Sequence, residues 1–247
     1  PAATAPGASG TAPIPSVPMP GGDTSLSNVS AAEEVAATGP VDLSRYELPD
    51  FAKHSLNRVG VLAAGNTPFP AKGFGNADGR TLAVLMQRLR APVASRWASI
   101  ALRRALMSPL DTPRHVNGAD FAAERAWLLL RMGEANAARA VVNDVDGDNY
   151  TTRLLQVAMQ VSLATADPGG ICPIAERGNQ YIQQRGWALA RAMCAGLAGK
   201  PNEAGQLLDQ ARGGTPASDI DNLLAEKVLG TGAQGRRAVT LEWGGIT

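Results

Sequence analysis

The sequence predicts an all-α fold, an α-solenoid of helix-turn-helix repeats with a period of about 33 residues behind a disordered Ala/Pro-rich leader. Composition is the first reason: 45% of the residues are hydrophobic but only 4% are aromatic. Abundant Ala and Leu favour close helix packing, whereas strand formers are sparse. Periodicity is the second reason. A fixed period of this length is typical of arrays whose units are too small to bury their own apolar faces.

The period of 33 is visible at two sets of positions. One residue in each unit opens an apolar, helix-like run: Phe121, Leu154, Trp187 and Ile220. Another residue in each unit marks the break after that run: Gly133, Ala166, Gly199 and Gly232. The pattern predicts a repeat array over residues 117–232. The alternative is a non-repeating helical bundle whose spacings agree by accident.

Three segments flank or precede the array. Residues 1–44 are a leader rich in Ala, Pro and Gly, which cannot bury enough apolar surface to order itself. It is either a spacer or a remnant without a role, and the chain is either processed or part of a longer sequence. Residues 45–116 form an arginine-rich helical segment. Residues 233–247 are a strand-like tail, where the array ends or a further domain begins.

Within residues 45–116, we expect a first helix over Phe51–Ala64 and then a Gly/Pro-rich loop. The loop contains Gly73–Gly79, which looks superficially like a phosphate-binding loop. No predicted strand precedes it and no Gly-Lys-Ser/Thr follows, so we interpret it as a connector. Residues 80–107 then form two helices, with Pro92 in the first turn of the second.

In the array, the predicted helices pair within each unit. Asn117 and Asp120 are expected to cap the first helix. The predicted helices are residues 121–132 with 134–145, 152–165 with 168–177, 187–198 with 201–212, and 220–229 alone.

A glycine at the break and an alanine five residues later occur as Gly133 with Ala138 and as Gly199 with Ala204. The chain therefore resembles the tetratricopeptide repeats, with its best match over residues 130–138. It departs from that family at Ala166 and Ile171, in its period, and in lacking the usual Trp, Leu and Gly of the first helix. The resemblance implies a concave surface for a protein or peptide partner and implies no catalytic residues.

Cys172 and Cys194 are the only cysteines. In the repeat arrangement they fall on neighbouring helices, so a disulfide is within geometric reach. Such a bridge contributes about 3 kcal/mol and indicates an oxidising, exported location such as a bacterial periplasm. The alternative is two buried thiols in a cytoplasmic protein. No histidine lies nearby in the sequence, so we predict no metal at these cysteines.

Arginines are concentrated in residues 80–114, which hold seven of them against the single acidic residue Asp111. This surface is a candidate for docking an anionic envelope component: an acidic protein, a lipid headgroup or a glycan phosphate. A solvated face, or arginines paired with acids of the repeats, is the alternative. The predicted partner-binding residues are Arg88, Arg96, Arg103 and Arg104.

Other chemistry finds little support. The acidic run Asp144–Asn149 lacks the Gly and Glu positions of a calcium loop and is interpreted as a turn. No hydrolase or metalloprotease motif surrounds His54 or His115, and no cofactor, metal or catalytic residue is predicted. A net charge of +1 does not favour nucleic-acid binding, and no apolar run is long enough for a membrane span.

We therefore expect a non-catalytic protein-interaction or scaffold module of the bacterial cell envelope. The alternative is the helical, non-catalytic portion of a peptidoglycan-acting enzyme, because soluble lytic transglycosylases carry long helical superhelices. Their catalytic Glu-Ser pair does not occur in this sequence. Nucleic-acid binding through the arginine helices is a third class, and it predicts retention that falls steeply with salt.

Overall fold

A computed structural model describes residues 49–232, except 64–66, 68, 91–92, 215 and 217–218. The chain divides into two units, Pro1–Glu47 and Leu48–Thr247, and every element considered below belongs to the second. Helices dominate the described residues, which confirms the all-α class. The predicted leader over residues 1–44 and the predicted tail over residues 233–247 lie outside the described residues.

The N-terminal part is less helical than the sequence predicts. Instead of a helix over Phe51–Ala64, it has a 3-10 turn at Asp50–Ala52 and the short strand β1 at Arg58–Val59. Strand β1 pairs antiparallel with β2, Leu110–Asp111. A helix is excluded because Gly60 has a φ of 155°, and a Cβ there would lie 2.3 Å from the backbone of Ser108. The helix prediction was wrong because tertiary contacts hold this segment in a turn and a short strand.

The two helices expected over residues 80–107 are α1, Gly79–Arg88, and α2, Arg96–Met107. The Asp78 carboxylate caps α1 by accepting the N–H groups of Arg80 and Thr81, and the Ser95 hydroxyl caps α2. Helix α2 begins at Arg96, and Pro92, which was predicted in its first turn, lies outside the described residues.

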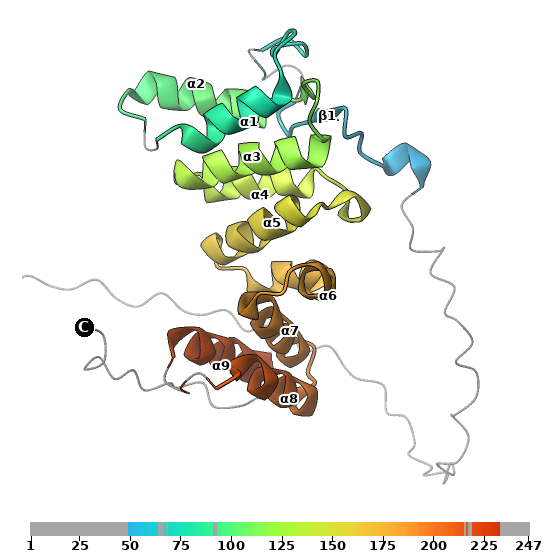
Figure 1. The fold of residues 1–247 in the computed structure, drawn as a ribbon, viewed down its shortest axis with the longest axis vertical. Coiled ribbons are helices and arrows are strands. Elements are labelled where there is room, and N and C mark those ends of the chain that lie inside the picture. Colours follow the sequence, from blue (N-terminus) through green and yellow to red (C-terminus); the bar gives the residue numbers. More distant parts are fainter. Residues whose placement is uncertain are drawn as a thin grey trace, which may run out of the picture. The chain divides into compact units, whose positions relative to one another are not determined.

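The C-terminal part is a succession of helices, each packed on its neighbours in the sequence (Figure 1). Contacts join α3 to α4 and α5, α6 to α5 and α7, and α7 to α8 and α9. The bounds are α3 Gly118–Arg131, α4 Ala135–Asn143, α5 Thr152–Ala164, α6 Cys172–Tyr181, α7 Arg185–Leu197, α8 Pro201–Arg212 and α9 Ile220–Gly232. The 3-10 turns Gly147–Asn149 and Pro168–Ile171 precede α5 and α6.

Helices α3, α5 and α7 end in the same turn. Gly133, Ala166 and Gly199 have φ angles of 82°, 53° and 75°, in the left-handed region. In each case the next N–H donates back five residues, as from Glu134 to the Leu129 carbonyl at 2.9 Å. These are Schellman motifs, which satisfy carbonyls at the helix end. Gly232, the fourth predicted break, is the last residue of α9.

The buried positions follow the same spacing over three helix pairs. Three residues at this spacing are completely buried, at 0% exposure: Ala138 of α4, Ile171 at the end of the 3-10 turn before α6, and Ala204 of α8. Phe121, Leu154 and Trp187 are buried on the first helices. Ile220 is 52% exposed, so the predicted fourth member of that set does not share the packing of the other three. The core is divided into clusters that succeed one another along the chain.

Candidate functional site

The first helices of successive pairs line a hollow of about 270 Å³. Trp127 of α3 and Trp187 of α7 contribute aromatic carbon, although Trp187 is almost fully buried. Helix α5 contributes Arg153, Gln156 and Gln160. Because these side chains repeat along one face of α5, the hollow runs beside that helix.

A second hollow, of about 480 Å³, adjoins the first at Gln184, which lines both. Gln184 is the residue immediately before α7. The second hollow is formed by the end of α6, the start of α7 and the end of α8. We call the two hollows together the amide groove, after the amide side chains that line it: Gln156, Gln160, Asn179, Gln183, Gln184 and Gln210.

The amides of the groove are not engaged with the rest of the described chain. None of the six amide side chains makes a hydrogen bond to another described residue. Their hydrogen bonds to described residues involve the backbone only. Each primary amide offers two N–H donors and a carbonyl acceptor. The groove therefore presents both donors and acceptors along its length.

The charged groups of the groove are neutralised from within the protein. The Arg153 Nε lies 2.8 Å from a carboxylate oxygen of Glu124, which is buried on α3. Arg185 donates to Asp219 at 2.7 Å and to Asn222 at 2.6 Å. A ligand with a net charge gains little from such paired cations, whereas a neutral hydrogen-bonding ligand is accommodated.

The four arginines of the predicted surface differ in whether they form an ion pair within the described residues. Arg103 forms an ion pair with Glu134 at 3.0 Å, joining α2 to the turn after α3. Arg88, Arg96 and Arg104 are exposed and make no ion pair within the described residues. Arg103 therefore has a structural partner, and the other three remain available at the surface.

Two arginines of α3, which the sequence did not predict as functional, position α1 and α2. Arg125 is 1% exposed, and burial lowers the pKa of its guanidinium to about 10. Arg131 donates to the carbonyl oxygens of Gln87 at 3.1 Å and Leu89 at 3.0 Å, at the end of α1. The only signal for Arg125 in the sequence is its place among the small residues of α3.

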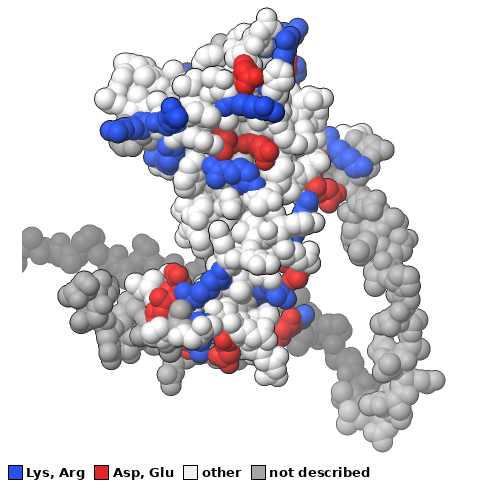
Figure 2. Space-filling view, viewed as in Figure 1, with Lys and Arg blue, Asp and Glu red and all other residues white. Residues whose placement is uncertain are grey.

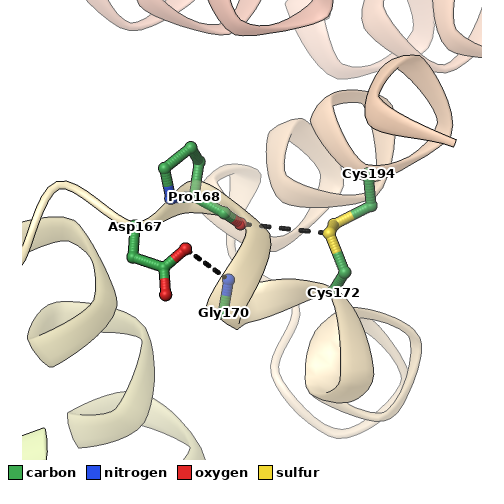
Figure 3. Close-up of a disulfide and its surroundings, with 5 residues drawn as sticks. All are labelled: Asp167, Pro168, Gly170, Cys172 and Cys194. Atoms are coloured by element: carbon green, nitrogen blue, oxygen red, sulfur yellow. Dashed lines mark hydrogen bonds between the residues drawn. A yellow bond between two sulfur atoms is a disulfide. The ribbon is translucent and has the colours of Figure 1, made fainter. Parts of the chain in front are cut away.

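The two cysteines lie where the sequence predicts, on adjacent helices. Cys172 begins α6 and Cys194 lies in α7, with their Cα atoms 5.4 Å apart and their sulfur atoms at the bonding distance of 2.07 Å (Figure 3). The Cys172 Sγ also lies near the carbonyl oxygen of Pro168. The cross-link thus joins the second helix of one pair to the first helix of the next.

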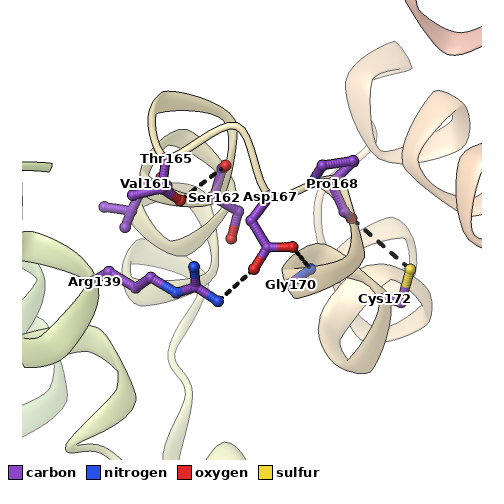
Figure 4. A network of polar contacts seen from close by, with 8 residues as sticks. All are labelled: Arg139, Val161, Ser162, Thr165, Asp167, Pro168, Gly170 and Cys172. Atoms are coloured by element: carbon purple, nitrogen blue, oxygen red, sulfur yellow. Dashed lines mark hydrogen bonds and ion pairs between the residues drawn. The ribbon is translucent and has the colours of Figure 1, made fainter. Parts of the chain in front are cut away.

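A polar network precedes the disulfide. Asp167 follows the left-handed residue Ala166, and one of its carboxylate oxygens accepts the N–H of Gly170 at 3.1 Å. Its other oxygen forms an ion pair with Arg139 of α4 (Figure 4). Asp167 therefore shapes the 3-10 turn before α6 and ties it to the preceding helix pair.

The acidic run after α4 is a structural junction. Asp144 accepts the N–H of Gly60 at 2.6 Å. Asp146 accepts the N–H of His54 at 2.7 Å and lies 2.8 Å from its Nδ1. The hydrogen bond between these side chains raises the pKa of His54 above 6.5 and lowers the pKa of Asp146 below 3.8. Part of the run, Gly147–Asn149, forms a 3-10 turn.

Comparisons with known proteins add no relationship. No family model matches the chain, nor does any curated protein or solved structure. Among the described residues, no helix has both the length and the apolar character needed to cross a bilayer.

Proposed function

We propose that this chain is a non-catalytic binding module of the bacterial cell envelope and that its amide groove holds an extended polypeptide segment of a partner. The observation that carries this proposal is the set of six amide side chains from α5 to α8 that line the two hollows and make no hydrogen bond to a described residue. An extended peptide exposes alternating N–H and C=O groups, and primary amides complement both. Neutralised arginines in the groove favour such an uncharged backbone over an anionic ligand.

The proposal includes a tandem helical array, an α-solenoid. Three observations support it: the Schellman turns at Gly133, Ala166 and Gly199, the buried residues that share their spacing, and the sequential packing of the helices. Stacked units of this kind commonly provide extended binding surfaces. His54 and His115 each pair with an aspartate and line neither hollow, which favours binding over catalysis.

The cysteine pair supports placement outside the cytoplasm. Disulfides persist in oxidising compartments such as the periplasm and are rare where thioredoxin and glutathione keep thiols reduced. Sulfur atoms of Cys172 and Cys194 lie at bonding distance, and they connect consecutive helix pairs. An exported protein is thus the expected setting for the groove.

The experiment is selection of 12-residue peptides from a displayed random library on the full chain, followed by affinity measurement of the selected peptides. Gln160→Ala and Gln184→Ala should each weaken binding by about fivefold, the loss of a hydrogen bond worth about 1 kcal/mol. Gln206→Ala is the matched control, because Gln206 is an exposed amide of α8 that lines neither hollow.

Two outcomes would reject the proposal. One is selection of peptides whose affinity is indifferent to Gln160 and Gln184. The other is retention of the full chain on purified peptidoglycan through these same amides with no peptide binding, which would favour the helical part of a cell-wall enzyme. A native-envelope pull-down with and without reductant then identifies the natural partner.

A further inference from the structure

The end of α1 and the start of α2 combine exposed apolar and cationic side chains. Leu85 is 59% exposed, Leu89 is 38% exposed and Trp97 is 80% exposed. The basic–apolar tip is defined by Leu85, Arg88, Leu89, Arg90, Arg96 and Trp97. Figure 2 shows blue side chains at the upper left, in the region of α1 and α2, with red side chains closer to the centre of that upper part.

The charge of the tip is not compensated locally. Residues 79–110 contain six arginines and no acidic residue. Arg80 donates to the carbonyl oxygen of His115, and Arg103 pairs with Glu134. The four others form no ion pair with any described residue: Arg88, Arg90, Arg96 and Arg104.

The tip is presented on a supported framework. Arg131 of α3 holds the last turn of α1 through the carbonyl oxygens of Met86, Gln87 and Leu89. The side chain of Met86 packs against the core, so the opposite side of that turn is left outward. Helix α2 starts at a side-chain cap, the Ser95 hydroxyl accepting the N–H of Ala98 at 3.3 Å. Binding at the tip therefore requires little new ordering of these helix ends.

We propose that the basic–apolar tip binds the surface of an anionic phospholipid membrane. Guanidinium groups complement lipid phosphates, and a tryptophan prefers the boundary between headgroups and acyl chains. Leu85 and Leu89 add carbon that can enter the same boundary. The combination of apolar and unpaired basic side chains is what interfacial membrane-binding helices use.

A membrane fits the tip better than an acidic protein does. The tip residues line neither hollow of the amide groove, and they project from two helix ends. A bilayer surface receives separate projecting side chains without needing a shape-matched pocket. Because the groove lies along α5 to α8, this proposal is independent of peptide binding and can fail without affecting it.

The test is co-sedimentation of the full chain with two kinds of vesicle. One is phosphatidylcholine alone, and the other is phosphatidylcholine with about 30% of the anionic lipid phosphatidylglycerol. We expect binding only to the anionic vesicles, with a loss at high salt. Arg88→Gln/Arg96→Gln should weaken binding by about 25-fold, since each arginine near such a surface contributes about fivefold. Trp97→Ser should weaken it by about tenfold.

Matched control variants distinguish an effect of the basic–apolar tip from the loss of any exposed cation or aromatic side chain. Lys72→Gln/Lys200→Gln removes two exposed cations elsewhere, and Tyr181→Ser removes an exposed aromatic residue of α6. Both should bind anionic vesicles like the unaltered chain. Equal binding to the two vesicle types, no binding to either, or equal losses in tip and control variants would each overturn the proposal. Capture by polyglutamate without vesicle binding would instead assign the tip to an acidic protein.

Discussion

The guanidinium of Arg125, buried in α3, donates hydrogen bonds to the carbonyl oxygen of Leu106 in the last turn of α2, with the Nε at 2.8 Å. The same side chain reaches the carbonyl oxygens of Val59 at 2.6 Å and Ser108 at 2.7 Å. One cation therefore joins β1, the end of α2 and α3. Its charge also complements the negative end of the α2 dipole.

Arg125→Met should lower the free energy of unfolding by about 3 kcal/mol, because the buried carbonyl groups of Leu106 and Val59 lose the donors that Arg125 supplies, whereas that of Ser108 keeps the N–H of Leu110. These acceptors belong to the backbone, so they remain in place after the substitution. A side-chain acceptor, by contrast, could be replaced together with the arginine. Urea denaturation measures the change, and the exposed Arg88→Met should stay within about 0.5 kcal/mol of the unaltered chain. Equal losses in the two variants would show that Arg125 has no special role.

At the equivalent positions of the left-handed turns, Gly→Ala and Ala→Gly substitutions should change the free energy of unfolding in opposite directions. Gly133→Ala and Gly199→Ala should each destabilise by about 1 kcal/mol, since alanine resists positive φ. A Cβ meets no atom within 4 Å at either glycine, so the cost is one of backbone conformation. Ala166→Gly should stabilise by about 1 kcal/mol because it relieves that cost. Thermal or urea unfolding of the three variants measures the signs, and stabilisation by Gly133→Ala would contradict the argument.

The disulfide predicts a stability that depends on reductant. Cys172→Ser/Cys194→Ser should be about 3 kcal/mol less stable than the oxidised chain, because a cross-link spanning 22 residues restricts the unfolded state. Non-reducing mass spectrometry after thiol alkylation should find both cysteines unmodified by the reagent. Two alkylated cysteines in protein taken from the native compartment would place the chain among proteins with free thiols.

The pair of His54 and Asp146 predicts a pH window. The raised pKa of His54 means that its contribution to stability is fully present below 6.5 and disappears as pH rises through the folded-state value. The pKa of Asp146 is lowered, so the contribution of the pair to stability is lost at acid pH, as pH falls below 3.8 and the carboxylate becomes protonated. His54→Gln should therefore lose more stability near pH 5 than near pH 8, measured by urea denaturation. Proton NMR should find the His54 pKa closer to 6.5 in Asp146→Asn, and an unmoved value would contradict the pairing.

Local signals in the sequence located most helix ends after residue 117. Asn117 caps α3 as predicted, its side chain accepting the N–H of Ala119 at 2.8 Å. Glycine at 133 and 199 indicated left-handed turns because that residue adopts positive φ at low cost. Asp120, the other expected cap, accepts instead the Thr151 hydroxyl of the next pair. The sequence does not distinguish an aspartate that caps its own helix from one that accepts a hydrogen bond from a residue far along the chain.

The amide groove was not predicted, because glutamines on helix surfaces are ordinary in sequence. Gln160 and Gln210 are 50 residues apart and line adjoining hollows only when α5 to α8 are packed. The arginine surface was predicted in outline. The structure alone separates Arg103, paired with Glu134, from the arginines of the basic–apolar tip.

Three features could be predicted from the residues alone: the all-α class, the positions of the turns after α3, α5 and α7, and the adjacency of Cys172 and Cys194. These follow from apolar spacing and backbone preferences within a few residues. The tertiary structure was needed to show that residues 53–63 form a turn and a short strand in place of a helix, with Gly60 against Asp144, and that Arg125 is buried. Those outcomes depend on contacts between residues far apart in the chain, where packing and hydrogen bonding override local propensity.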